Sequence, residues 1–156
     1  MQHIELMAPA GNFESLMAAI QGGADSVYFG IEKLNMRAGS SRNFLLTELN
    51  QISEICRENN VKSYLTLNTI MFDQDLDMMK EIIHEVKDTG ISAIIASDQS
   101  VMNYAFEKEV EIHLSTQLNI SNTEALKFYS RYADVVVLAR ELNLEQIGAI
   151  CHQIEK

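Results

Sequence analysis

Residues 64–98, YLTLNTIMFDQDLDMMKEIIHEVKDTGISAIIASD, combine two hydrophobic patterns in one stretch. A short β-prone run at 64–67 is followed by apolar residues at helical spacing from Leu76 to Val86, and the helical pattern ends at Gly90. Residues 93–96 then form a fully apolar run, which is typical of a strand buried on both faces. Strand, helix and strand in this order predict a βα unit of a parallel sheet.

The same alternation extends in both directions along the chain. The remaining strands are expected at 4–7, 26–29, 112–114 and 134–138. The helices between them are expected to begin at polar capping residues: Asn12, Thr47, Asp73, Ser121 and Asn143. The chain therefore reads as six consecutive βα units.

Two architectures are compatible with six βα units. An open, doubly wound sheet would normally carry a glycine-rich phosphate loop after its first strand, whereas this chain has Pro9-Ala10-Gly11-Asn12 there. A (β/α)8 barrel needs eight units and about 250 residues. We therefore predict an α/β fold in which residues 1–156 form a single domain, an incomplete TIM-type (β/α)8 barrel that stops before its last units.

Composition and charge limit the classes of partner. The chain has 22 Asp and Glu against 12 Lys and Arg, a net charge of −10, which disfavours binding to a phosphate backbone. No apolar run approaches the ~18 residues of a membrane span, and the N-terminus lacks a signal-peptide pattern. We expect a cytoplasmic protein without a membrane partner. Cys56 and Cys151 lie far apart, without the spacing of a zinc site or disulfide framework.

Polar side chains follow most of the expected strands. In parallel βα folds, ligands bind beyond the carboxyl ends of the strands, so these residues should surround one mouth. Arginines there offer a bidentate fork to a carboxylate or phosphate, which favours a polar, anionic ligand. The candidate substrate-binding residues are Asn35, Arg37, Asn68, Asp98, Ser115, Gln117, Arg140 and Glu141.

Catalytic residues are less evident than binding residues. His113 and Ser115 share a strand face but lie roughly 7 Å apart at ~3.3 Å per residue, beyond hydrogen-bond reach. His113 inside an apolar strand is more typical of a core residue than of a ligand, and Asp98 is as well placed to cap a helix as to bind substrate. Cys56 and Cys151 each share an apolar helical face and are expected to be core thiols.

Six ordered blocks of the chain resemble the collagenase-like peptidase family of unknown catalytic type, number thirty-two. The blocks are MAPAGNFESLMAAIQGGADSVYFG, LNMRAGSSRNF, YLTLNTIMFD, AIIASDQSV, EIHLSTQLNISNTEALKFY and VVVLARELNLEQI. The resemblance covers essentially the whole chain and implies the N-terminal portion of a TIM-like barrel. It also matches the strand-end residues named above to recurrent family motifs.

The resemblance implies two different activities. The family is named for proteases, so the first expectation is a hydrolase acting on peptides. Other members carry out oxygen-independent hydroxylation of RNA bases or quinone precursors with a 4Fe–4S cluster held by four cysteines. The cysteine-containing part would follow Lys156, and Cys56 and Cys151 do not match it, so no metal ligand or cofactor is assigned to this chain.

The incomplete barrel has two further implications. Residues 1–156 are expected to be catalytically inactive by themselves. The first and last strands of the predicted sheet would also be left as unpaired edges, which favours either an open sheet or self-association through those edges.

Overall fold

The computed structural model describes residues 4–32, 34 and 43–153. The strands are β1 (Met7–Pro9), β2 (Ser26–Phe29), β3 (Lys62–Leu67), β4 (Ala93–Ala96), β5 (Ile112–Leu114) and β6 (Val135–Val136). The α-helices are α1 (Phe13–Gln21), α2 (Leu49–Glu58), α3 (Leu76–Thr89), α4 (Gln99–Glu107), α5 (Thr123–Tyr129) and α6 (Leu144–His152). Short 3-10 turns are η1 (Leu46–Glu48), η2 (Asp73–Asp75) and η3 (Thr116–Leu118).

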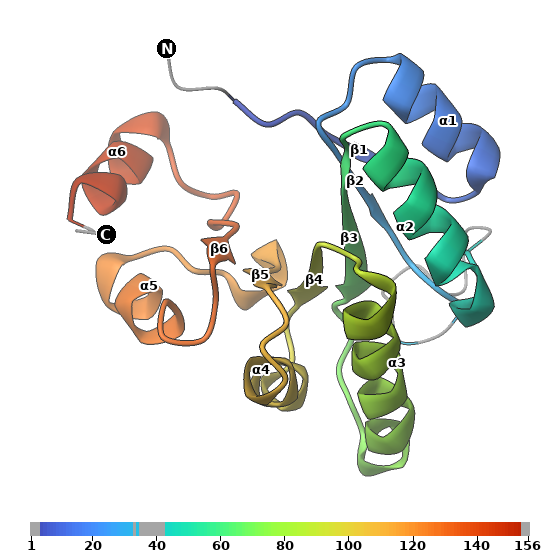
Figure 1. Ribbon diagram of the computed structural model, residues 1–156. Coiled ribbons are helices and arrows are strands. Elements are labelled where there is room, and N and C mark those ends of the chain that lie inside the picture. The colour runs from blue at the N-terminus through green and yellow to red at the C-terminus, as the bar shows by residue number, and fades with distance from the viewer. Residues whose placement is uncertain (1–3, 33, 35–42, 154–156) are drawn as a thin grey trace.

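The six strands form one parallel sheet in the order β1-β2-β3-β4-β5-β6. Each helix returns the chain so that the next strand lies beside the previous one, which is the winding of a barrel. A doubly wound sheet would instead reverse its strand order at a switch point. The helices lie in an arc outside the strands, with α1 and α6 at its two ends (Figure 1). The fold is therefore an incomplete TIM-type barrel, as the sequence predicts.

The first and last strands differ from the expected ranges. β1 begins at Met7, because Met7 to Pro9 pair with Ser26 to Tyr28, and the edge position tolerates the missing N–H of Pro9. β6 is limited to Val135–Val136, where it pairs with His113 and Leu114. Apolar character alone did not fix these boundaries, because a strand ends where its neighbour stops offering backbone partners.

Side chains facing the helices form the hydrophobic core. Alternate residues of β2 to β5 point to the outer face and are almost fully buried: Val27, Phe29, Leu65, Leu67, Ile94, Ala96, Ile112 and Leu114. They pack against the apolar faces of the helices, such as Ile82 and Ile83 of α3. This packing holds the strand ends at the positions where the candidate site forms.

The inner face of the sheet is polar near the amino-terminal ends of the strands. Tyr64 Oη donates a 2.6 Å hydrogen bond to Glu5 Oε1, and Lys62 Nζ lies 3.0 Å from Glu5 Oε2. The His113 ring contacts the Tyr64 ring at a tilt of 60°, with ring centroids 4.5 Å apart, and His113 Nε2 lies 2.8 Å from Glu111 Oε1. These contacts join the segment before β1 to β3, and the His113 ring links β3 to β5.

Helix capping follows the sequence at some positions and not at others. Asn12 and Asn143 cap α1 and α6 through side-chain acceptors, as predicted. Asn122, not Ser121, caps α5, because its side chain reaches the N–H of Ala125.

The two cysteines lie in different environments. Cys56 is buried, and burial raises the pKa of its thiol to about 11. The prediction of a core position was wrong for Cys151, which is exposed near the end of α6.

Within the residues that the structure describes, no helix combines the length and the apolar character needed to cross a membrane.

Candidate functional site

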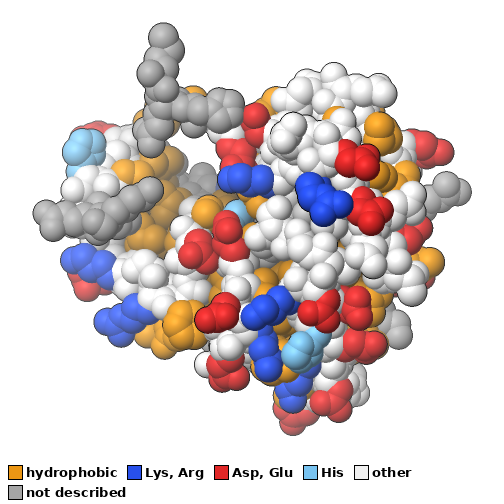
Figure 2. Space-filling view, in the orientation of Figure 1, with side chains coloured by type: hydrophobic (Ala, Val, Ile, Leu, Met, Phe, Trp, Pro, Cys, Tyr) orange, Lys and Arg blue, Asp and Glu red, His pale blue; other side chains and the backbone are white. Residues whose placement is uncertain are grey.

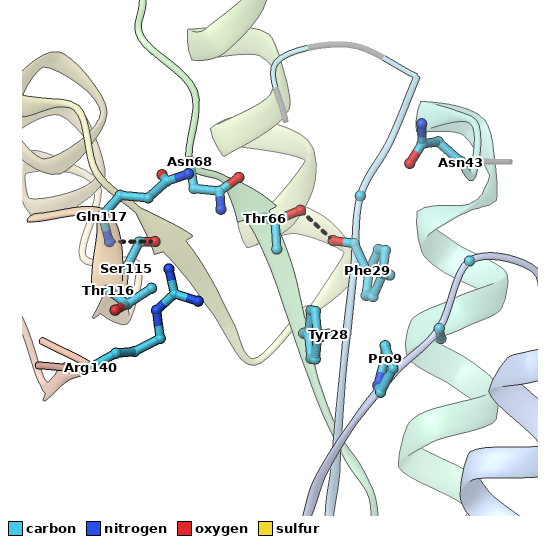
Figure 3. A pocket seen from close by; sticks show the side chains of 13 residues that line it. Pro9, Tyr28, Phe29, Asn43, Thr66, Asn68, Ser115, Thr116, Gln117 and Arg140 are labelled. Atoms are coloured by element: carbon cyan, nitrogen blue, oxygen red, sulfur yellow. Dashed lines mark hydrogen bonds between the residues drawn. The ribbon is translucent and has the colours of Figure 1, made fainter. Parts of the chain in front are cut away.

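A hollow of about 340 Å³ opens at the carboxyl ends of the strands. Its walls come from the ends of β1, β2, β3 and β5 and from the segment after β6 (Figure 3). The lining residues are Pro9, Ala10, Gly11, Tyr28, Phe29, Gly30, Asn43, Thr66, Asn68, Ser115, Thr116, Gln117 and Arg140. Residues separated by up to 131 positions therefore share one pocket because all the strands are parallel.

The end of β5 positions three of these side chains. Ser115 N donates to Ala96 O at 2.8 Å, which holds the chain beside β4 as the strand ends. The chain then turns through η3, and Asn119 closes the turn with a positive φ of 50°. Ser115 Oγ accepts from Gln117 N at 3.4 Å. This tight turn places Ser115, Thr116 and Gln117 along one wall.

Four of the eight candidates from the sequence meet in this pocket. Asn68 and Gln117 lie side by side at one wall, and Arg140 directs its guanidinium toward the space beside Ser115 (Figure 3). Of the described residues that line the pocket, Arg140 is the one with a charged side chain. The arrangement presents a cation, three side-chain amides and several hydroxyl groups to a bound molecule.

The other four candidates are elsewhere or are not described. Asp98 is the N-cap of α4, where Oδ1 accepts from Ser100 N at 2.8 Å and Oδ2 from Met71 N at 3.1 Å. Glu141 is exposed and does not line the pocket. Asn35 and Arg37 lie outside the described residues.

The carboxylate of Asp98 is occupied by these backbone contacts. Burial raises the pKa of Asp98, but hydrogen bonds from the Ser100 hydroxyl and from backbone N–H groups outweigh that effect and hold the pKa below its usual value. The ionised carboxylate thus ties the loop containing Met71 to the start of α4. Its observed contacts are those of a capping residue.

Nine lining residues were not among the sequence candidates. Tyr28, Phe29 and Thr66 lie within strands rather than after them. Thr66 Oγ1 donates to Phe29 O at 3.0 Å, which joins β2 and β3 at the pocket floor. The sequence did contain a pattern from which Tyr28 could have been predicted. Val27 and Phe29 alternate as apolar residues, and in a strand this turns Tyr28, which lies between them, to the opposite face.

Ser115 and His113 do not form a hydrolytic pair. Ser115 is 4% exposed and lies in a turn contact with Gln117, while His113 Nε2 is directed to Glu111. Nucleophilic catalysis requires a base within hydrogen-bond reach of the nucleophile. The pocket contains groups suited to binding and orienting a polar molecule.

A 4Fe–4S cluster does not fit the residues present. Such a cluster needs four cysteine ligands, and the sequence has two. Cys56 is buried on α2 and Cys151 is exposed on α6. Across residues 4–32, 34 and 43–153, no group of three or more His, Cys, Asp or Glu side chains is arranged to hold a metal ion.

A parallel βα barrel segment with a polar pocket at its strand ends places the chain in the class of TIM-barrel folds. Comparison with known proteins identifies the family within that class. The model of Peptidase family U32 matches residues 11–156, and the chain belongs to this family.

Named relatives within the family differ in their described activities. A "Collagenase" of Porphyromonas gingivalis is 63% identical over 146 residues, covering 94% of this chain and 35% of that protein. "tRNA hydroxylation protein P1" of Bacillus subtilis is 31% identical over 154 residues, covering 97% of this chain and 36% of that protein. The chain thus spans about a third of the length of these curated relatives.

A solved U32 peptidase structure has the same fold. It superposes with a TM-score of 0.75 at 11% identity, covering 98% of this chain and 66% of that one. The likeness supports the barrel-type winding of the six βα units.

Proposed function

We propose that this chain is the substrate-binding portion of a U32-family enzyme and that its strand-end pocket holds a polar, anionic ligand. The observation that carries the proposal is the convergence of Asn68, Ser115, Gln117 and Arg140 on one hollow. Arg140 would pair with a carboxylate or phosphate, while the amides would donate to and accept from neighbouring polar atoms. Arg37 would contribute a second cation beside Arg140, and Asn35 would contribute a further amide. Glu141 would border the opening of the pocket.

Arg140→Ala tests the role of the guanidinium. Titrating ¹⁵N-labelled protein with uridine monophosphate and with an aspartate-containing tripeptide should shift amide signals of Gly11, Gly30 and Thr116. A charge-assisted contact contributes about 1.5–3 kcal/mol, so we expect at least about tenfold weaker binding in the variant. Arg131→Ala, which removes an arginine outside this pocket, is the matched control. Equal affinity of the wild type and Arg140→Ala would contradict the proposal.

For the reaction of the longer protein, we propose peptide hydrolysis, supported by the relative named collagenase. The chemistry would then depend on a nucleophile or activated water supplied outside the described residues, and residues 1–156 alone should not cleave peptides. A fluorogenic gelatin assay on this chain should therefore remain at background.

The alternative is iron–sulfur-dependent hydroxylation of an RNA base or a quinone precursor. It is favoured by the relative named for tRNA hydroxylation and by the lack of a Ser–His hydrogen bond in the pocket region described. Iron and sulfide measured anaerobically in a protein of the relatives' length would decide between the two. About four irons per chain would support hydroxylation, whereas none would support hydrolysis.

We further propose that the chain associates with itself through the open edges of its sheet. Ile4, Leu6 and Val137 are 86%, 57% and 41% exposed beside β1 and β6. Unpaired edge backbone next to apolar side chains promotes pairing with another chain. Sedimentation velocity should show a concentration-dependent dimer, and Leu6→Lys with Val137→Lys should shift it to monomer. Ile70→Lys, in the loop after β3, is the control, and a wild-type monomer at all concentrations would refute the idea.

We also propose a cytoplasmic location, which is supported by two free cysteines rather than a disulfide.

A further inference from the structure

An aromatic cluster lies on the outer surface of the fold, between α4 and α5. Phe106, Phe128 and Tyr132 are 55%, 52% and 38% exposed. Their rings contact one another edge-on or tilted, with centroids 6.0 Å apart for Phe106 and Tyr132 and 6.3 Å for Phe128 and Tyr132. We call these three residues the aromatic ridge.

The aromatic ridge separates two hollows of different character. On one side is an apolar groove of about 180 Å³, lined by Met102, Tyr129 and ridge residues. On the other side is a wider groove of about 650 Å³ that contains Glu107, Glu109, Glu111 and Asp134. Arg131 is the cationic residue among the described residues lining this acidic groove. Figure 2 shows orange side chains between α4 and α5 with red side chains beside them.

Local contacts leave most of this negative charge accessible. Glu109 lies 3.7 Å from Lys87 but its side chain is 89% exposed, and Glu111 is 48% exposed while contacting His113. Glu107 accepts from Asn103 Nδ2 on its own helix at 2.8 Å. Four carboxylates beside two cations, Arg131 and Lys87, leave a net negative charge that favours a cationic partner.

The aromatic ridge is unlike ordinary surface. Scattered exposed apolar residues are common, but clustered aromatic side chains next to a groove mark interaction surfaces. Aromatic faces also attract lysine and arginine side chains. The aromatic ridge and the acidic groove therefore both favour a partner that carries lysines or arginines. The ridge attracts them through the faces of its aromatic rings, and the groove attracts them through its carboxylates.

We propose that this surface docks a cationic, amphipathic peptide segment of a partner protein. One apolar side chain of the segment occupies the groove beside Met102 and Tyr129. Its lysines or arginines lie over the aromatic ridge and reach the carboxylates of the acidic groove. The acidic groove favours a cationic segment over a second copy of this chain, whose net charge is −10, and the self-association proposed above uses the sheet edges rather than this surface. The proposal is independent of the pocket at the strand ends.

The test uses a fluorescein-labelled amphipathic peptide of lysine and leucine, measured by fluorescence anisotropy against the 156-residue protein. A glutamate-leucine peptide of the same pattern and a lysine-serine peptide are the probe controls. We expect binding of the lysine-leucine peptide alone, weakened by added salt. Phe128→Ala and Glu107→Lys should each weaken binding about tenfold.

Two control variants separate the surface from general charge or hydrophobicity. Glu54→Lys makes the same charge change at an exposed position on α2, and Leu144→Ala removes an 87% exposed apolar side chain on α6. Both should bind like the wild type. Equal losses in Glu54→Lys and Glu107→Lys would overturn the proposal, as would unchanged binding in Phe128→Ala. Loss of self-association in Phe128→Ala would also overturn it, by making a second copy the occupant.

Discussion

Leu65→Ala is expected to destabilise the protein by about 3 kcal/mol. Leu65 is fully buried in β3, between β2 and β4, and faces the helices. Removing a buried leucine loses its transfer free energy and leaves a cavity, which together cost about 2.7–5 kcal/mol in comparable sites. Domains of this size are stable by about 5–15 kcal/mol, so this loss is a large share of the total. Leu65→Ala should therefore unfold at a clearly lower urea concentration than the wild type.

Leu144→Ala serves as the matched control for Leu65→Ala. The same substitution at an 87% exposed position should change the free energy of unfolding by less than about 0.5 kcal/mol. Urea unfolding followed by circular dichroism measures both variants. Similar midpoints for Leu65→Ala and Leu144→Ala would show that β3 is not at the centre of a packed core.

Acid is expected to weaken the fold through Glu5. The hydrogen bond from Tyr64 Oη, with help from Lys62 against the effect of burial, lowers the pKa of Glu5 from 4.5 to about 2. A carboxylate whose pKa is lower in the folded state adds stability above its unfolded pKa. That contribution should therefore be full above about pH 5 and disappear as the pH falls from about 4.5 to about 2.

Glu5→Gln isolates this contribution. The side chain of Glu5 is 37% exposed, so solvent screening reduces the expected effect to about 1–2 kcal/mol at pH 7. Urea unfolding at pH 7 and at pH 2.5 should show a difference from the wild type that shrinks in acid. Tyr64→Phe should reproduce much of the loss of stability, and Glu54→Gln, at an exposed position on α2, should not. A difference that is independent of pH would contradict the assignment to Glu5.

The sequence alone determined the fold class and the general place of the site. Helical spacing from Leu76 to Val86 and the apolar run at 93–96 identify βα units, because hydrophobic period follows secondary structure directly. The missing glycine-rich loop at Pro9–Asn12 favoured the barrel. Parallel strands bring their carboxyl ends to one edge, so polar residues after each strand could be named as candidates before any contact was known.

Only the tertiary structure decided which candidates meet. Asn68, Gln117 and Arg140 line one pocket, whereas Asp98 follows a strand equally closely but caps α4 and binds Met71 N. A short polar side chain after a strand can turn to the pocket or to the next helix, and both cases show the same local pattern of a polar residue after an apolar strand. Tyr28 joins the site from inside a strand because strand pairing sets which face it occupies and how far it lies from the mouth.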